Sequence, residues 1–554
     1  MTNEHEWLPH LEDAIPKSAY GKKLSMYTIA LEAWRRGIAV KFYRVEDPEE
    51  NKSRIRYSLS YQGREHKFES SRGDLLTQEA YDVCDDKDLT KQYLSKAGIP
   101  VPEGRRFTED AADEEIVDYT QTLGDPVVLK PISENGGKGV FADIRDAEDM
   151  RKALIHVRQE LNYRDVIVEK HVTGEEFRIF IVGHEIIGAV NRTPAHIVGD
   201  GISSIGELID KKNKEKRGNP NLFKSAIEID KELLNTIQSK NYTLNSIPES
   251  GHRIFLRNKS SVSMGGDPND VTNRVTSQMK DLATKSYKSI PGLDLCGLDM
   301  IVDEENDSGT IIEVNTKPML GLHLFPVKGS ARDVTAPIID YYFPETIDME
   351  KTNLYFDFDS VLEPLKSRST DMVEVTSPPL GRLYTQRYIV SGRVQGVGYR
   401  KWIRKQALQH QLHGYTKNKK DGKVVVVVAG SNESDVRAFK DICAQGPEKA
   451  QVEKVKAKEW EKPVKMGFEI KKESSSKKRL KELEKQLQKE KNDKKKIARE
   501  RSALDQEKKA TKQKLKALEE EKESLQQEYM ALRNSRVWRY TRPLRNISSM
   551  TKRS

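Results

Sequence analysis

Two glycine-rich stretches of the sequence stand beside a basic side chain, a combination suited to holding phosphate. The first, SENGGKG at 133–139, comes just after an apolar run that ends at Lys130. Glycine allows backbone N–H groups to converge on an anion, and a lysine supplies a fixed positive charge. The loop residues expected to close over phosphate are Ser133, Gly136, Gly137 and Gly139. The stretch is not a Walker A loop, because Lys138 is followed by glycine rather than by the Ser or Thr that holds magnesium. An ordinary glycine turn beside a surface lysine is the alternative.

The second stretch, VSGRVQGVGYR at 390–400, ends on Arg400. A guanidinium is planar and can donate two parallel hydrogen bonds to a phosphate, which an ammonium group cannot. The backbone amides from Gln395 to Arg400, at the start of an expected helix, would add further donors. The polypeptide therefore offers two separate candidate phosphate sites.

A third group of residues suits a hard cation. Residues 296–315, CGLDMIVDEENDSGTIIEVN, predict a β-hairpin whose connection is the cluster of Asp, Asn, Ser and Gly. Glu313 and Asn315 are two residues apart, so both project from one face of a strand, and Asp299 can approach them from the paired strand. Three oxygen-bearing side chains on one face would hold magnesium against phosphates. A solvated sheet face is the alternative.

Local patterns indicate the elements that must position these residues. Residues 86–104 predict a helix that stops at Gly98 and leads into an extended segment. Residues 165–182 contain two β-rich runs joined by a short polar hinge, which could present backbone groups to an adenine edge. Residues 1–83 combine a helical run with an alternating stretch typical of an edge strand or hairpin, as in a small α/β domain. Residues 348–383, rich in proline, serine and charge, are expected to be a linker.

Five motifs of residues 84–347, taken in order, resemble the ATP-grasp fold, and within it the ligase domains of cyanophycin synthetase and of bifunctional glutathione synthetase. They are KPISENGGKGV, VEKHVTGEEFR, RTPAHIVGDGISSIGELI, RIFLRNKSSVSMGGDPNDVT and IIEVNTKPMLGLHLFPVKG. This family activates a carboxylate with ATP as an acyl phosphate, which an amine then attacks to form an amide. The resemblance implies an ATP- and magnesium-dependent ligase with small-molecule carboxylate and amine substrates, whose identity stays open. NTKPMLG departs from many relatives, which carry proline and glycine closer together after the metal-binding Asn.

The resemblance also implies roles for individual residues. Lys87 and Lys130 would contact the phosphates, and Glu176 would hold the ribose. Arg257 would meet the reacting phosphoryl and carboxylate groups. The adenine hinge would be lined by Glu169, His171 and Val172. Two magnesium ions, with manganese as the substitute, would be bound by Asp299, Glu313 and Asn315.

Residues 384–472 resemble acylphosphatase. GRVQGVGYR matches the signature of that family, and GYTKNKKDGKV matches its second motif. The expected order is strand, helix, a hairpin about Asp421-Gly422, helix and strand, which is a ferredoxin-like split βαβ sandwich. The resemblance implies that Arg400 clamps the phosphate of an acyl phosphate and that Asn418 orients the attacking water, with no metal and no covalent nucleophile. A catalytically idle binding domain is the alternative.

The two resemblances fit one chemistry, since the first domain would make an acyl phosphate and the second would hydrolyse one. A hypothesis follows: the downstream domain discards acyl phosphates that escape the ligase before an amine arrives. The expected fold class is a multidomain α/β and α+β protein, with an ATP-grasp fold, an acylphosphatase domain and a C-terminal coiled coil.

The C-terminal arm is set apart by its charge and by a heptad pattern. Residues 471–554 contain 27 Lys and Arg against 13 Asp and Glu, so the arm carries more positive charge than the net +9 of the whole chain. Apolar residues at heptad spacing in 473–533 predict a coiled coil and a parallel homodimer, with a solvated single helix as the alternative. The tail 534–554 combines basic residues with Trp538 and Tyr540, which favours an anionic membrane surface. Nucleic acid is the rival partner, but no recognised reading module accompanies the arm.

The three cysteines of the chain are scattered, which suits a reducing compartment and argues against a zinc site. No signal peptide or membrane span is expected, because the apolar runs are short and the first residues are polar. We therefore expect a bacterial cytoplasmic enzyme whose tail is a candidate contact with the inner face of the cell membrane. The alternative is a membrane-associated coiled-coil scaffold of a cell-envelope polymer assembly, with one catalytic unit vestigial.

Overall fold

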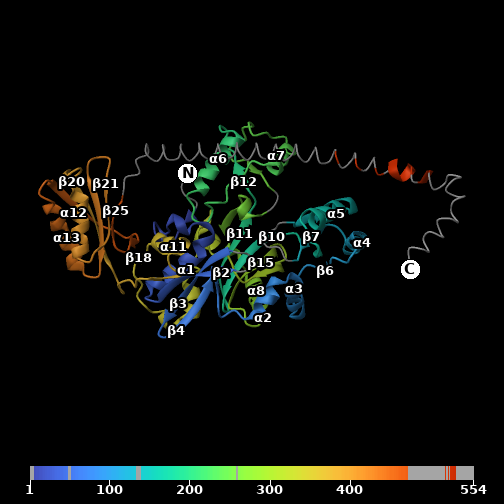
Figure 1. The fold of residues 1–554 in the computed structure, drawn as a ribbon, viewed down its shortest axis with the longest axis horizontal. Coiled ribbons are helices and arrows are strands. Elements are labelled where there is room, and N and C mark those ends of the chain that lie inside the picture. The colour runs from blue at the N-terminus through green and yellow to red at the C-terminus, as the bar shows by residue number, and fades with distance from the viewer. Residues whose placement is uncertain are drawn as a thin grey trace, which may run out of the picture. The chain divides into compact units, whose positions relative to one another are not determined.

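A computed structural model describes residues 5–47, 52–132, 139–257 and 260–471, together with isolated positions between 514 and 531. The chain divides into two compact units, 1–471 and 472–554. The larger sheets of the first unit, as far as it is described, are three of five strands and one of four. Figure 1 labels many of their strands and helices. None of the described helices is long and apolar enough to cross a membrane.

The N-terminal sheet is antiparallel and has the order β19-β2-β3-β4-β5. Its strands are β2 (Ala39–Asp47), β3 (Lys52–Tyr61), β4 (Arg64–Glu69), β5 (Arg72–Gly73) and β19 (Met372–Val375). Alternate side chains such as Phe42, Tyr57 and Phe68 enter a core that also contains α1 (Leu24–Arg35), every residue of which is buried. The predicted helix and the predicted hairpin of residues 1–83 are both present.

Residues 348–383 do not form the expected linker. They contain β18 (Leu354–Tyr355), α11 (Phe358–Lys366) and β19, and Phe356, Phe358 and Leu362 lie in the same core as α1. Because β19 pairs antiparallel with β2, this segment completes the N-terminal sheet. Its polar residues occupy the exposed sides of α11 and β19, while Phe358, Val361, Leu362 and Leu365 of α11 are buried.

The predicted phosphate loop begins where β7 ends, in a four-stranded sheet of order β6-β9-β7-β8. Its strands are β6 (Gly104–Phe107), β7 (Val127–Pro131), β8 (Phe141–Ile144) and β9 (Val166–Lys170). Helices α4 (Asp113–Leu123) and α5 (Ala147–Leu154) share a core with Leu129 and Val168.

The oxygen-bearing residues lie in an antiparallel sheet of order β14-β11-β10-β15-β16. Its strands are β10 (Glu175–Val182), β11 (Glu185–Thr193), β14 (Asp267–Asp270), β15 (Leu295–Asp303) and β16 (Ser308–Asn315). Side chains of α2 (Gln78–Asp85), α3 (Lys87–Lys96) and α8 (Ser277–Lys288) pack in its core. The predicted end of the helix is confirmed, since α3 stops just before Gly98, where φ is 72°.

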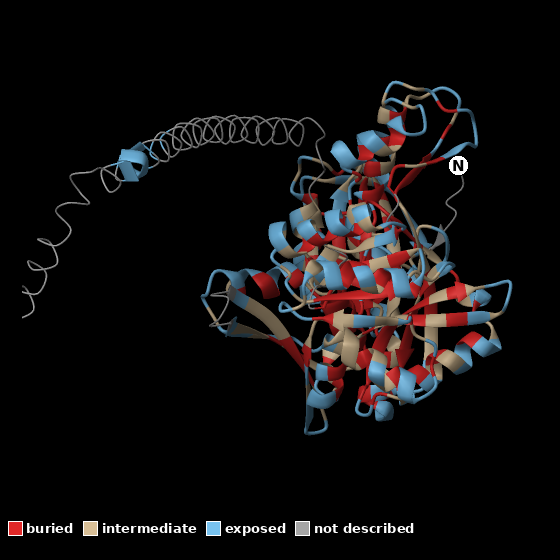
Figure 2. Ribbon diagram, turned by 90° about the vertical axis from the view of Figure 1, so that its right-hand side faces the viewer, coloured by how far each residue is buried: buried red, intermediate tan, exposed pale blue. Residues whose placement is uncertain are grey.

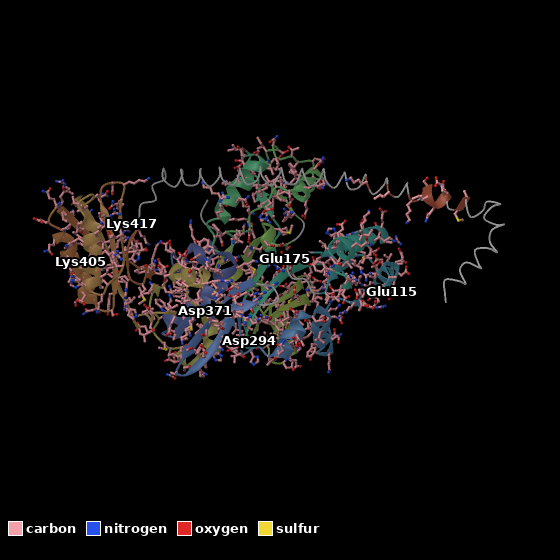
Figure 3. All side chains as sticks on the ribbon, viewed as in Figure 1. Glu115, Glu175, Asp294, Asp371, Lys405 and Lys417 are labelled. Carbon is pink, nitrogen blue, oxygen red and sulfur yellow. The ribbon has the colours of Figure 1, made fainter. Side chains whose placement is uncertain are left out.

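Smaller elements connect these sheets. A separate core joins β12 (His196–Val198) and β13 (Arg253–Phe255) to α6 (Ile205–Lys216) and α7 (Lys231–Gln238). The short pair β1 (His5–Glu6) and β17 (Gly329–Ser330), α9 (Gly321–Leu324) and α10 (Ala336–Tyr342) complete this part. The hydroxyl of Tyr342 donates to Asp294, which stands just before β15 and is labelled in Figure 3. Burial raises the pKa of Asp294.

The last sheet of the first unit has the order β23-β20-β22-β21-β25. Its strands are β20 (Tyr384–Arg393), β21 (His413–Asn418), β22 (Val424–Gly430), β23 (Gln451–Glu459) and β25 (Phe468–Lys471), and its helices are α12 (Tyr399–Gln409) and α13 (Glu433–Gln445). The predicted βαββαβ order is confirmed, with β25 added beside β21. The hairpin turns at Gly422, where φ is 84°, as its Asp-Gly pair predicted.

Both faces of this last sheet are buried along β22. Val424 and Val426 point into the core with α12 and α13, whereas Val425 and Val427 lie in the core of the N-terminal sheet. The strand β24 (Val464–Lys465) also pairs in parallel with β18. Figure 2 shows such buried runs in red along the strands. The C-terminal sheet and the N-terminal sheet therefore share one hydrophobic core.

The coiled coil expected for 473–533 and the tail 534–554 lie almost wholly outside the described residues. The few described positions between 514 and 531 are helical and exposed. Pairing of two arms into a dimer stays a prediction.

Candidate active sites

Strand register places the predicted metal ligands on one face of the five-stranded sheet that contains β15 and β16. Asp299 lies directly opposite Glu313, and Gly297 lies directly opposite Asn315. Opposite residues of an antiparallel pair project to the same side, and so do residues two apart on one strand. The three oxygen-bearing side chains therefore share a face, as the alternation predicted, while metal binding itself stays a prediction.

Two arginines that sequence reasoning missed face these oxygens. Arg178 on β10 lies opposite Asp299 and holds both of its carboxylate oxygens, with Nη2 at 2.6 Å from Oδ2. Arg192 on β11 lies 3.4 Å from the same carboxylate and also pairs with Glu176. Although burial opposes the charged form, Asp299 raises the pKa of Arg178. A signal was present in EEFRIFIV, where a single arginine interrupts an apolar strand and so requires a buried partner.

Gly297 makes room for this arrangement. A Cβ atom at that position would come 3.1 Å from Cδ of Arg178 and 3.1 Å from Cβ of Pro318. A side chain there would push the guanidinium of Arg178 away from Asp299. The glycine therefore allows Arg178 to lie flat across β15 beside the oxygen-bearing residues.

The donor set at this face fits magnesium. Asp299, Glu313 and Asn315 offer carboxylate and amide oxygens, the ligands that hard divalent cations prefer. Asn315 keeps a buried amide nitrogen with no hydrogen-bond partner among the described residues, so its amide is not committed to another contact. In the same described ranges, no group of three or more His, Cys, Asp and Glu side chains could hold a metal ion.

A second basic cluster lies at the end of β7. The Nζ atom of Lys130 lies 2.6 Å from the buried carboxylate of Glu169, and Lys91, a residue that sequence reasoning missed, lies 3.1 Å from it. Lys87 donates to the carbonyl of Ile132 at 3.2 Å. The structure thus brings Lys87, Lys130 and Glu169 together next to the expected phosphate loop. Of that loop, Ser133, Gly136 and Gly137 lie outside the described residues, and Gly139 has a φ of 73°.

The hinge between β9 and β10 leaves one polar side-chain atom without a partner among the described residues. The backbone N–H of His171 donates to Pro126 at 2.9 Å, while its buried Nδ1 has no hydrogen-bond partner in the described ranges. Val172 follows, and Gly174 has a φ of 149° with its Cα so close to β15 that a Cβ would come 2.3 Å from the carbonyl oxygen of Val302. The hinge is therefore held tightly against β15, and its adenine role stays a prediction.

Arg257 lies apart from these groups in the small subdomain. Its guanidinium pairs with Asp230 at 2.6 Å and with Glu232 at 2.8 Å, and the side chain is buried. Both partners belong to the start of α7 rather than to the β14–β16 sheet. The structure does not bring Arg257 together with Asp299, so its expected contact with the reacting groups stays a prediction.

The second candidate site lies at the start of α12. Gly396 and Gly398 have φ values of 77° and 83°, a conformation that favours glycine, and α12 begins immediately afterwards. Arg400 is half-buried in the first turn and has no ion-pair partner among the described residues. Gln395 Nε2 donates to the carbonyls of Lys419 and Lys423, at 2.9 and 2.8 Å, which fastens the loop to the β21–β22 hairpin.

That hairpin carries Asn418, at the end of β21 opposite Val424. Its Oδ1 atom is buried and has no hydrogen-bond partner in the part of the chain that the structure describes. Leaving a buried acceptor unpaired costs roughly 1–3 kcal/mol, so it is expected to be satisfied by water or a ligand. Asn418 is therefore suited to hold a water molecule.

Tyr399 is the first residue of α12. The ring is buried, and its hydroxyl donates to the carbonyl of Cys443 at 2.6 Å. The hydroxyl thus fixes the start of α12 against α13, next to Arg400.

Comparisons with known proteins match two parts of the chain. Residues 84–197 match the RimK-like ATP-grasp domain family, and residues 386–470 match the acylphosphatase family. A cyanophycin synthetase of Trichormus variabilis is 34% identical over 268 residues, which cover 47% of this chain and 29% of the relative. The glutathione biosynthesis bifunctional protein GshAB of Clostridium perfringens is 35% identical over 278 residues, which cover 47% and 34%. A solved bifunctional glutathione synthetase from Pasteurella multocida is 27% identical with a TM-score of 0.43, covering 59% of this chain and 45% of that one.

Two parts of the chain therefore match known domain families. One is a RimK-like ATP-grasp domain, and the other is an acylphosphatase domain, so both resemblances are confirmed. The chain spans about a third of the length of the curated relatives that it matches.

Proposed function

We propose that the protein is an ATP- and magnesium-dependent ligase that joins a carboxylate to an amine through an acyl phosphate, combined with an acylphosphatase that hydrolyses acyl phosphates to carboxylate and phosphate. One observation supports the ligase above all: Asp299, Glu313 and Asn315 share a face on which Arg178 lies opposite Asp299. Transfer of a phosphoryl group to a carboxylate needs both cations and fixed donors around the oxygens that carry charge.

Each group of residues has a distinct task in this proposal. Lys87, Lys91 and Lys130 neutralise the phosphates of ATP at the end of β7. Asp299, Glu313 and Asn315 hold magnesium, two ions in our proposal with manganese as the substitute, and bound magnesium supplies positive charge against the phosphates. Arg178 and Arg192 orient the substrate carboxylate. The roles of Glu169, His171, Val172, Glu176 and Arg257 at the nucleotide and the reacting groups are part of the same proposal.

The hydrolase site needs fewer parts. Arg400 and the loop amides hold the phosphoryl group, and the unpaired Oδ1 of Asn418 accepts a hydrogen bond from the attacking water and so orients it. An acyl phosphate is a reactive mixed anhydride, so positioning and charge stabilisation suffice.

Two assays on the full chain test these activities separately. With ATP, magnesium and pools of amino acids and small peptides, ADP release should require an amine and should stop when EDTA removes the metal. Hydrolysis of benzoyl phosphate should continue in EDTA. ADP release that no pool stimulates would contradict the ligase, and benzoyl phosphate that decays no faster than in buffer would contradict the hydrolase.

We further propose a homodimer formed by 473–533, an anionic membrane surface as the partner of 534–554, and the cytoplasm as the compartment. Each basic residue near such a surface contributes about 1 kcal/mol. The full chain should sediment as a dimer and should pellet with anionic vesicles at low salt, whereas residues 1–471 should do neither. Equal behaviour of the two chains would contradict both ideas. A pure scaffold role has no observation in its favour, since both sites keep their reactive side chains.

A further inference from the structure

Four cationic side chains surround Glu69 at the edge of the N-terminal sheet. Arg56 and Arg72 lie 3.1 and 3.0 Å from its Oε2 atom. Lys317 lies 2.8 Å from its Oε1 atom, and Arg54 lies 4.0 Å from the same atom. The four cations and Glu69 are called the cation cluster below. The cluster is built from three neighbouring strands and a loop: β3 carries Arg54 and Arg56, β4 carries Glu69, β5 carries Arg72, and Lys317 follows β16. Glu69 lies directly opposite Arg72.

The cation cluster lies beside the oxygen-bearing face of the ligase site. Lys317 follows Asn315 by two residues, a span of at most about 7 Å between Cα atoms. Ser71 donates to the carbonyl of Pro318 at 2.7 Å, so the turn between β4 and β5 is fixed on the same loop. The backbone spacing alone therefore allows a short substrate to reach from one place to the other.

The cation cluster carries more positive charge than its ion pairs use. Arg56, Arg72 and Lys317 pair with no carboxylate other than Glu69 in the described ranges of the chain. Glu69 is ionised at neutral pH, because Lys317 and Arg72 lower its pKa to about 2 although burial acts in the opposite direction. Three positive charges thus face one negative charge. The three cations repel one another, because all of them lie within about 3 Å of the same carboxylate.

This surplus charge can be reached from solvent. The side chains of Arg56 and Lys317 are 39% and 43% exposed, whereas those of Arg72 and Glu69 are 20% and 19% exposed. Exposed ion pairs contribute little to the stability of a fold. A purely structural role, in which the cations hold the sheet edge to the loop, therefore does not explain why several of them gather here. An arginine fork binds a carboxylate more strongly than a single ammonium does, which makes the exposed donors a binding surface.

We propose that the cation cluster binds a second carboxylate of the ligase substrate, one that is not itself activated, so that the substrate is at least a dicarboxylate. This proposal rests on the ligase function proposed above. Glu69 supports a carboxylate rather than a phosphate, because the same cations already hold a carboxylate in this structure. A small dicarboxylic acid and an acidic peptide share this chemistry.

Direct binding to the full chain, without ATP, tests the proposal independently of turnover. The probes are glutarate, tetraglutamate and inorganic phosphate, titrated by calorimetry. Replacing two forks in Arg56→Ala/Arg72→Ala should weaken carboxylate binding by about tenfold or more. Glu69→Gln should tighten it, because it removes the carboxylate that competes for the same donors. Lys41→Ala is the matched control, since Lys41 is a cation of the same sheet that pairs with Glu374 instead.

The outcomes separate the possible ligands. Preference for tetraglutamate identifies an acidic peptide, and preference for glutarate identifies a small dicarboxylic acid. Binding of phosphate alone, or equal carboxylate binding by the parent and the double variant, would overturn the proposal. The opposite shift in Glu69→Gln keeps the test decisive if the double variant fails to fold. The chain could bind carboxylates and yet release no ADP with any pool. That result would contradict the ligase function, and the cation cluster would remain a carboxylate-binding surface.

Discussion

Benzoyl phosphate hydrolysis is expected to fall by about a hundredfold or more when Arg400 is replaced by alanine, because the phosphoryl group loses its only guanidinium donor in the first turn of α12. Arg400→Lys should recover only a small part of the rate, since an ammonium group keeps the charge but not the fork. Initial rates in EDTA measure both effects.

Lys405→Ala is the matched control for this experiment. Lys405, labelled in Figure 3, is an exposed cation of the same helix. A loss of hydrolysis as large in Lys405→Ala as in Arg400→Ala would show that the charge of the helix, rather than one fork, drives the reaction.

The Arg400→Ala chain also tests whether the second domain discards escaped acyl phosphate. In that case ATP consumed per amide formed should change, and unchanged coupling would count against it.

Amide synthesis is expected to fall by a similar factor, about a hundredfold or more, when Glu313 is replaced by glutamine. The amide keeps the shape of the side chain but removes one negative charge from the proposed magnesium site. More magnesium should then be needed for half-maximal ADP release. Glu313→Gln is the cleaner variant, because it leaves the buried pair between Arg178 and Asp299 in place.

Asp299→Asn should have the same effect on ADP release with an added loss of stability. Removing one partner of a buried ion pair typically costs about 3–5 kcal/mol. Urea denaturation should therefore separate Asp299→Asn from Glu313→Gln. Glu185→Gln, at the exposed first position of β11, is the control for loss of a carboxylate from this sheet. An unchanged magnesium requirement in Glu313→Gln would show that this face does not bind the metal.

Much of the fold could be predicted because its signals are local. The hairpin of residues 296–315 shows alternating apolar residues on either side of a turn cluster, and the helix of 86–104 ends at a glycine. The linker prediction for 348–383 was wrong because it used amino-acid composition, which does not show what a segment packs against. Its role depends on β19 pairing with β2, a strand far earlier in the chain, and no local pattern reports that partner.

The site was predictable to the same extent. Asp299, Glu313 and Asn315 follow from strand alternation, so the sequence was enough to place them on one face. Arg178 and Lys91 were missed because each is defined by a carboxylate on another element, Asp299 and Glu169. The cation cluster was missed for the same reason, since its members come from three strands and a loop.

The valine-rich strand β22 has a consequence for how the two activities occur in the cell. Since Val425 and Val427 belong to the same buried cluster as residues of the N-terminal sheet, separating the two domains would expose apolar surface on both pieces. The separated domains would be expected to associate or aggregate through this apolar surface. The RimK-like domain and the acylphosphatase domain are thus expected to persist in a fixed one-to-one ratio, as parts of one folded unit.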